Sequence, residues 1–210
     1  MTCTASKAAE PEQPQWRIAS AYSLVATDVT FSNDEGAELR RRAVTLGLER
    51  RLGDAWAIQL TGGASLGGDI EVGSERYELT PGWLASLSGS YRVLDGDGYA
   101  PFVLVGLAVG ASSVVAERGE EDASFTATDV RASATVGKLF WGAVAPFASV
   151  NAFGGPIFWE RGGEDVTGSD DYHFQLGGGL LVTAEGIWSA FAEIVPLGER
   201  ALRFGASFAF

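Results

Sequence analysis

Apolar and polar residues alternate with a period of two along almost every segment from Trp16 to the C-terminus. This period indicates β-strands with one apolar face, because successive side chains of a strand point to opposite sides. In the last segment, ALRFGASFAF, Leu202, Phe204 and Phe208 share one face and Arg203 lies on the other. Turn residues divide the chain into ten such segments, and no helical period interrupts them.

The connections between these segments alternate in length. The short ones are 52–55, 95–98, 141–144 and 185–186, and the longer ones are 28–39, 69–76, 117–124 and 160–171. Outer-membrane barrels have short periplasmic turns, longer external loops and strands of about 9–11 residues. We therefore predict one all-β domain over 15–210, an antiparallel up-and-down transmembrane barrel of ten strands with both termini periplasmic. Counts of eight or twelve follow if the weaker hairpins are divided differently.

The two faces of the predicted strands differ in a way that favours a membrane barrel over a soluble one. The face opposite the apolar residues carries mostly Gly, Ser, Thr and Ala with scattered charges, and the chain has 28 glycines. Such a face is too polar for a soluble core but suits a barrel lumen. Aromatic residues near the predicted strand ends suggest two interfacial girdles: Trp16, Trp56, Tyr77, Tyr91, Tyr99, Phe140, Trp141, Trp159, Tyr172, Trp188, Phe208 and Phe210.

Charge and cysteine content limit the binding partners and the covalent modifications expected for the chain. A formal net charge of −12 argues against nucleic acid, whose phosphates require a basic surface. The single cysteine, Cys3, excludes an internal disulfide, and Met1 and Thr2 do not fit a lipoprotein-processing motif, so we interpret Cys3 as incidental. Residues 1–14 are polar and are predicted to be a disordered leader.

Three segments, APFVLVGLAVG, VRASATVGKLF and FGGPIFW, resemble small bacterial outer-membrane β-barrel proteins of the opacity-like and porin-like superfamily. Phe204, Phe208 and the terminal Phe210 resemble the C-terminal signal by which such proteins are recognised for insertion. The resemblance implies an outer-membrane location, with membrane lipid, lipopolysaccharide and the barrel-assembly machinery as partners. We expect a monomer without a cofactor or a metal.

A set of polar residues on the last five strands is predicted to point into the lumen: Asp129, Arg131, Asn151, His173, Gln175, Glu193 and Arg203. Charges in a narrow lumen must be paired, since an unpaired buried charge is costly. Because a ten-stranded barrel leaves little open space, these residues form either a plug or a gated path. The function predicted is therefore a non-enzymatic barrel with a structural role or a role in small-solute passage.

Two other functions stay open. Asp171 and His173 resemble half of the catalytic site of the omptin outer-membrane proteases, so a hydrolase at the barrel rim is one alternative. A barrel-type lipid A deacylase would need a serine beside the histidine, and none adjoins His173. The acidic segments 119–122, 162–165 and 169–171 suggest a surface interaction protein, or contact with lipopolysaccharide phosphates through divalent cations.

Overall fold

The computed structural model describes residues 14–32, 35–96, 98–119, 121–161, 164–184 and 186–210. Cys3 and most of the predicted leader lie outside these ranges. The described residues form one antiparallel sheet and contain no helix long and apolar enough to cross a membrane. The strands are β1 (Trp16–Phe31), β2 (Gly36–Leu52), β3 (Trp56–Val72), β4 (Glu75–Leu79), β5 (Gly82–Asp95), β6 (Phe102–Arg118), β7 (Glu121–Gly137), β8 (Val144–Gly154), β9 (Ile157–Arg161), β10 (Glu164–Asp170), β11 (Phe174–Ala184), β12 (Trp188–Gly198) and β13 (Arg200–Ala209).

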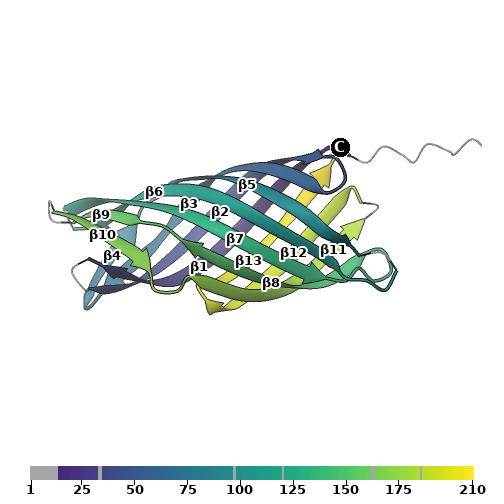
Figure 1. Cartoon of the computed structure of the whole chain (residues 1–210). Coiled ribbons are helices and arrows are strands. Elements are labelled where there is room, and N and C mark those ends of the chain that lie inside the picture. Colours follow the sequence, from purple (N-terminus) through teal and green to yellow (C-terminus); the bar gives the residue numbers. More distant parts are fainter. Residues whose placement is uncertain (1–13, 33–34, 97, 120, 162–163, 185) are drawn as a thin grey trace, which may run out of the picture.

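Ten strands form a closed ring in the order β1, β2, β3, β5, β6, β7, β8, β11, β12 and β13 (Figure 1). Pairing of β13 with β1, from Arg17↔Ala209 to Ala26↔Arg200, closes this ring. The amide of Trp16 donates to the carbonyl of Phe210 at 3.2 Å, so the two ends of the barrel domain lie together. The predicted ten-stranded antiparallel barrel is confirmed.

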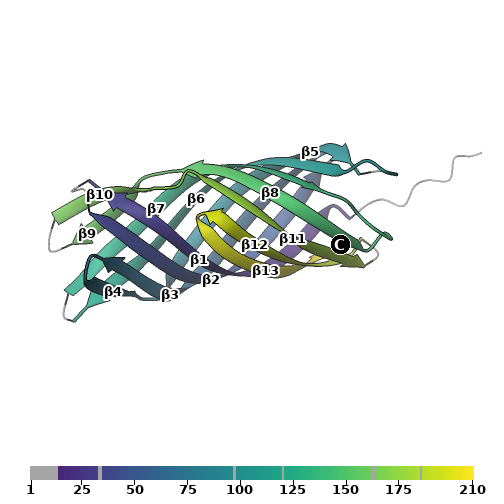
Figure 2. The same ribbon diagram turned by 90° about the horizontal axis from the view of Figure 1, so that it is seen from below.

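The wall loses two strands along its length, because the β12–β13 hairpin ends partway along the barrel (Figure 2). Beyond the hairpin tip, β1 exchanges β13 for β10 and pairs with it from Val29 to Phe31. The strands β4 and β9 extend the wall beyond β5 and β8, so the ring there consists of β1, β2, β3, β4, β6, β7, β9 and β10. We call the two parts the ten-stranded section and the eight-stranded section.

The two sections have opposite polarity. In the ten-stranded section the exposed outward side chains are apolar, as Leu46, Leu60 and Leu107 illustrate. In the eight-stranded section most apolar side chains, unlike Val115 and Phe158, lie inside and form a buried core: Val29, Phe31, Ala37, Leu39, Ile70, Val72, Tyr77, Leu79, Val114, Ala116, Ala123, Phe125, Ile157 and Trp159. The apolar outer surface of the first section suits lipid, whereas the second section is built like a water-exposed barrel.

The predicted long loops are wrong for this reason. In segments 28–39, 69–76, 117–124 and 160–171, most of the described residues belong to strands. Their outward residues include Glu38, Arg40, Glu71 and Arg76, which exchange ion pairs on the surface. These charges gave the segments a loop-like composition, although the inward residues keep the alternation of a strand.

The predicted aromatic girdles are wrong at Tyr77 and Trp159. Trp159 is only 1% exposed and makes an edge-on contact with the Tyr77 ring at 5.1 Å between centroids. Other aromatics lie on the outer wall, including Trp188, which packs against Phe208 at 4.6 Å. Tyr77 and Trp159 therefore fill the eight-stranded section and do not face lipid.

We predict that Trp159→Ala lowers the free energy of unfolding by about 3–5 kcal/mol, because it empties the centre of this core. Trp188→Ala, at a site that is 59% exposed, is the matched control and should cost much less. Urea unfolding of the detergent-folded protein measures both changes. Equal losses in the two variants would contradict the buried core.

Candidate functional site: the polar network in the lumen

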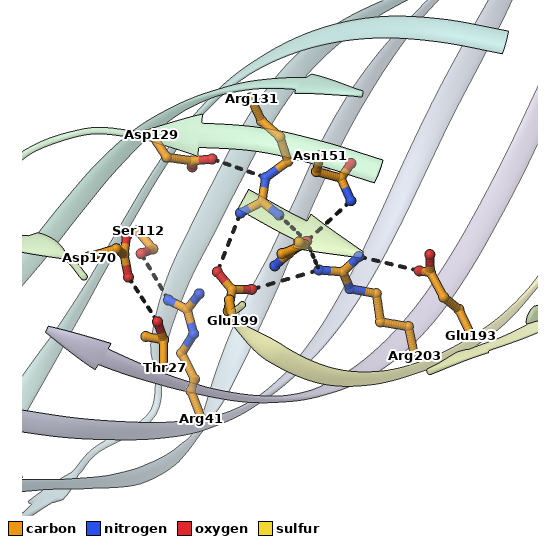
Figure 3. A network of polar contacts seen from close by, with 11 residues as sticks. Thr27, Arg41, Ser112, Asp129, Arg131, Asn151, Asp170, Glu193, Glu199 and Arg203 are labelled. Atoms are coloured by element: carbon orange, nitrogen blue, oxygen red, sulfur yellow. Dashed lines mark hydrogen bonds and ion pairs between the residues drawn. The ribbon is translucent and has the colours of Figure 1, made fainter. Parts of the chain in front are cut away.

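Polar side chains from several strands meet inside the barrel where ten strands become eight (Figure 3). The meeting point is the tip of the β12–β13 hairpin, which brings Glu199 into the lumen with an exposure of only 8%. Gly198 precedes it with a φ of +81°, and a side chain there would collide with the carbonyl of Phe174. Glycine is therefore needed for the turn that delivers Glu199.

Glu199 lies between two arginines from opposite parts of the wall. Its carboxylate is 3.5 Å from Nη2 of Arg131 on β7 and 3.7 Å from Nη2 of Arg203 on β13. Arg203 also pairs with Glu193 at 3.3 Å, and Glu193 accepts a hydrogen bond from Ser149 at 2.6 Å. The result is a chain of alternating charges that runs from β7 to the β12–β13 hairpin and returns to Ser149 on β8, the strand paired with β7.

Gln175 on β11 supports the same two arginines. The side chain is completely buried, and its Oε1 accepts hydrogen bonds from Arg131 at 3.0 Å, Asn151 at 3.2 Å and Arg203 at 3.4 Å. Asp129 adds a contact of 3.5 Å to Nε of Arg131. The amide oxygen thus holds both guanidinium groups while the carboxylates balance their charge.

A second group lies beside this network, toward the eight-stranded section. Arg41 donates to Oγ of Ser112 at 3.0 Å, and Thr27 donates to Oδ1 of Asp170 at 3.1 Å. Asp170 lies on β10, beyond the apolar outer belt. The pKa of its carboxyl is raised from 3.8 to about 6: burial contributes most to the rise, the charge of Glu199 adds to it, and the hydrogen bond from Thr27 opposes it. Asp170 therefore takes up its proton near pH 6.

The structure brings together six of the seven predicted lumen residues: Asp129, Arg131, Asn151, Gln175, Glu193 and Arg203. Sequence reasoning missed Glu199, which lies in the turn between the last two strands. It also missed Arg41, the middle residue of an Arg-Arg-Arg run. In a strand the side chain of this middle residue must point to the opposite face from those of its two neighbours. Three consecutive arginines in a strand therefore indicate that at least one of them points into the lumen.

His173 does not join the network. It is exposed, its carbonyl accepts a hydrogen bond from the Phe153 amide, and a side chain added at Gly154 would lie 3.5 Å from its Nδ1. The inward prediction for His173 is wrong because the strand alternation is broken between β10 and β11. Asp171 accepts a hydrogen bond from Thr30 at 2.6 Å on the exposed side.

The other predicted features lie apart from the lumen network. Phe204 stacks on Tyr22 at 5.2 Å, and Phe210 stacks on Phe208 at 6.1 Å, all on the outer wall. Their role as an insertion signal stays a prediction. Within the described ranges, no three His, Cys, Asp or Glu residues are grouped to hold a metal ion.

A cavity of about 1020 Å³ occupies the lumen of the ten-stranded section, near the end where the termini meet. Its lining includes Arg17, Glu49, Arg51, Gln59 and Arg92. Arg17 pairs with Glu49 at 3.7 Å across the β1–β2 register. The lumen is therefore roomy and polar at one end, crossed by ion pairs in the middle and filled by apolar side chains at the other.

Comparisons with known proteins establish the fold. No protein-family model and no curated protein matches the sequence. The outer-membrane protease OmpT from Escherichia coli is 9% identical, with 93% of this chain and 97% of that chain covered and a TM-score of 0.59. The outer-membrane protein OprG from Pseudomonas aeruginosa is 10% identical, with 95% and 97% covered and a TM-score of 0.50. The β-domain of the Bordetella autotransporter BrkA is 14% identical, with 94% and 100% covered and a TM-score of 0.50.

The chain thus has the fold of a small bacterial outer-membrane β-barrel, as its sequence resemblance implies. These similar structures include a protease and an autotransporter domain. A shared fold does not carry a shared activity, so the function must be argued from the lumen itself.

The raised pKa of Asp170 predicts a pH dependence of stability. The folded state binds this proton more tightly than the unfolded state, so stability is greatest below about pH 4 for this group and falls as the pH rises through 6. The wild type should lose about 1 kcal/mol more than Asp170→Asn between pH 5 and pH 7.5. Urea unfolding at both pH values measures the difference, and Asp122→Asn, at an exposed site, should keep the wild-type change.

An identical change in the wild type and in Asp170→Asn would contradict this assignment.

Proposed function

We propose that the chain is a non-enzymatic integral outer-membrane protein with a structural role, whose lumen is closed and whose termini are periplasmic. The observation that carries the proposal is the chain of ion pairs from Arg131 through Glu199 and Arg203 to Glu193. These groups hold one another in place, because each guanidinium group contacts two carboxylates and exposing this network of charges in a narrow lumen is costly.

A second barrier lies in series with the network. The eight-stranded section contains bulky side chains, including Trp159, Tyr77, Phe31 and Phe125. Rings of Phe31 and Phe125 contact Trp159 at 5.1 and 6.4 Å between centroids. A barrel of about eight strands is just filled by its side chains, which supports closure at this end as well.

The proposed orientation places the eight-stranded section outside the cell. Its polar outer surface and apolar interior suit an aqueous surrounding, and the apolar belt of the ten-stranded section suits the bilayer. In this orientation the exposed C-terminal residues Phe204, Phe208 and Phe210 are presented to the barrel-assembly machinery from the periplasmic side.

Passage of a small solute is the second candidate function, and the cavity of about 1020 Å³ favours it. A polar solute could enter at the end where the termini meet and occupy the cavity on that side of the network. Passage would then require both the ion pairs and the apolar core to open.

Conductance in a planar bilayer distinguishes the two functions. We predict that the wild type conducts no ions and that Arg203→Ala alone stays silent, because the apolar core still blocks the path. Combining Arg203→Ala with Trp159→Ala removes part of both barriers and should produce openings. Ser207→Ala with Trp188→Ala is the matched control, since Ser207 lines the cavity and Trp188 faces outward.

Steady conductance of the wild type would overturn the closed barrel and favour solute passage. Openings with Arg203→Ala alone would show that the network is the only barrier.

A further inference from the structure

The outer wall contains a groove where the ten-stranded section meets the eight-stranded section. It has a volume of about 930 Å³ and lies on β1, β2, β3, β4, β12 and β13. Because barrel diameter grows with strand number, the wall steps inward beyond the hairpin tip and leaves a hollow. A β-bulge adds to it, since Leu66 and Gly67 together stand opposite Arg42 in the β2–β3 register.

One half of the groove is apolar and continuous with the membrane belt. It is lined by the outward side chains of Leu24, Leu66, Ile194 and Leu202, which are all exposed, Ile194 to 61%. An exposed apolar hollow at this level fits a hydrocarbon chain, which fills it without displacing a polar partner.

The other half carries four outward arginines, Arg40, Arg42, Arg76 and Arg200. Two acidic residues, Asp69 and Glu78, line the same groove, so the outward arginines outnumber the acids in the lining itself, although the whole chain carries −12. Glu38 and Glu71 border the groove, and both form ion pairs with Arg40.

The arginines differ in their partners. Arg40 and Arg200 share Glu38, at 2.9 and 3.2 Å, and Arg76 pairs with Asp69 at 3.3 Å. Arg42 is exposed and forms no ion pair with another residue in the described part of the chain. It also lies nearest the apolar half, two positions from the belt residue Val44 on the same face of β2.

We infer that this groove binds a lipid with a phosphorylated headgroup, its acyl chain against the apolar half and its phosphate on Arg42. Arg40 and Arg200 lie beside this position and supply further donors to the phosphate oxygens. Along the barrel axis, the lining changes from apolar side chains next to the membrane belt to arginines farther from it. A ligand that is apolar at one end and anionic at the other matches this change. The contact is direct and does not require the divalent cations expected for the acidic segments.

The identity of the lipid rests on the proposed orientation. With the termini periplasmic, the arginines face the outer leaflet, and the ligand is the phosphorylated lipid anchor of lipopolysaccharide. The binding chemistry itself depends only on the groove.

Native mass spectrometry of the detergent-folded protein with added bisphosphorylated lipid A tests the inference. Arg42→Gln should weaken lipid binding about tenfold, the effect of losing one charge-assisted contact. Arg50→Gln is the matched control: Arg50 lies on the same outward face of β2, is also exposed, and sits at the opposite end of the belt over the Trp16 ring. The control should bind as the wild type does.

Equal binding by Arg42→Gln and the wild type would overturn the inference, and so would an equal loss in Arg50→Gln. Lipid A stripped of its phosphates must bind at least tenfold more weakly than intact lipid A, and equal binding would also overturn it. Phosphatidylglycerol binding as tightly as lipid A would support the phosphate site but overturn the assignment of its ligand to the lipid anchor of lipopolysaccharide. Arg42 lies outside the wall, so conductance tests the closed lumen independently of these results.

Discussion

A buried carboxylate between two guanidinium groups is the interaction on which the rest of this barrel depends. Glu199 contacts Arg131 and Arg203 where the β12–β13 hairpin ends and the wall loses two strands. Without it, each arginine would keep only one carboxylate partner, Asp129 for Arg131 and Glu193 for Arg203, and the contact between the hairpin tip and β7 would be lost. The same contact joins the hairpin tip to β7 at the step in the wall.

The step in the wall lies between a part of the barrel that suits lipid and a part that suits water. The outward and inward residues of a single strand change in character at this step. On β2 the outward residues pass from Leu48 and Val44, beside lipid, to Arg40 and Glu38, beside water, while the inward residues change from Gly47 to Leu39. The hydrophobic effect therefore acts outward on one part of a strand and inward on the next. The polar network lies at the crossover, where neither an apolar core nor open water is available.

Much of this architecture could be predicted from the sequence, because alternation with a period of two is a local property. The ten-stranded ring follows from it, and so does the inward side of Arg131, Gln175 and Arg203. The eight-stranded section could not, since its outward charges resemble those of loops. Trp159 shows the limit: its position near a strand end suggested an interface, and only the pairing of β9 with β7 places it in a core.

The central claim is that Glu199 fastens the hairpin across the lumen, and hydrogen–deuterium exchange of wild type and Glu199→Gln tests it most directly. The account predicts faster exchange in Glu199→Gln at the backbone amides of Val195 and Ala201, with β2 and β3 unchanged. Unchanged exchange at these hairpin amides, in a variant that still folds, would contradict it.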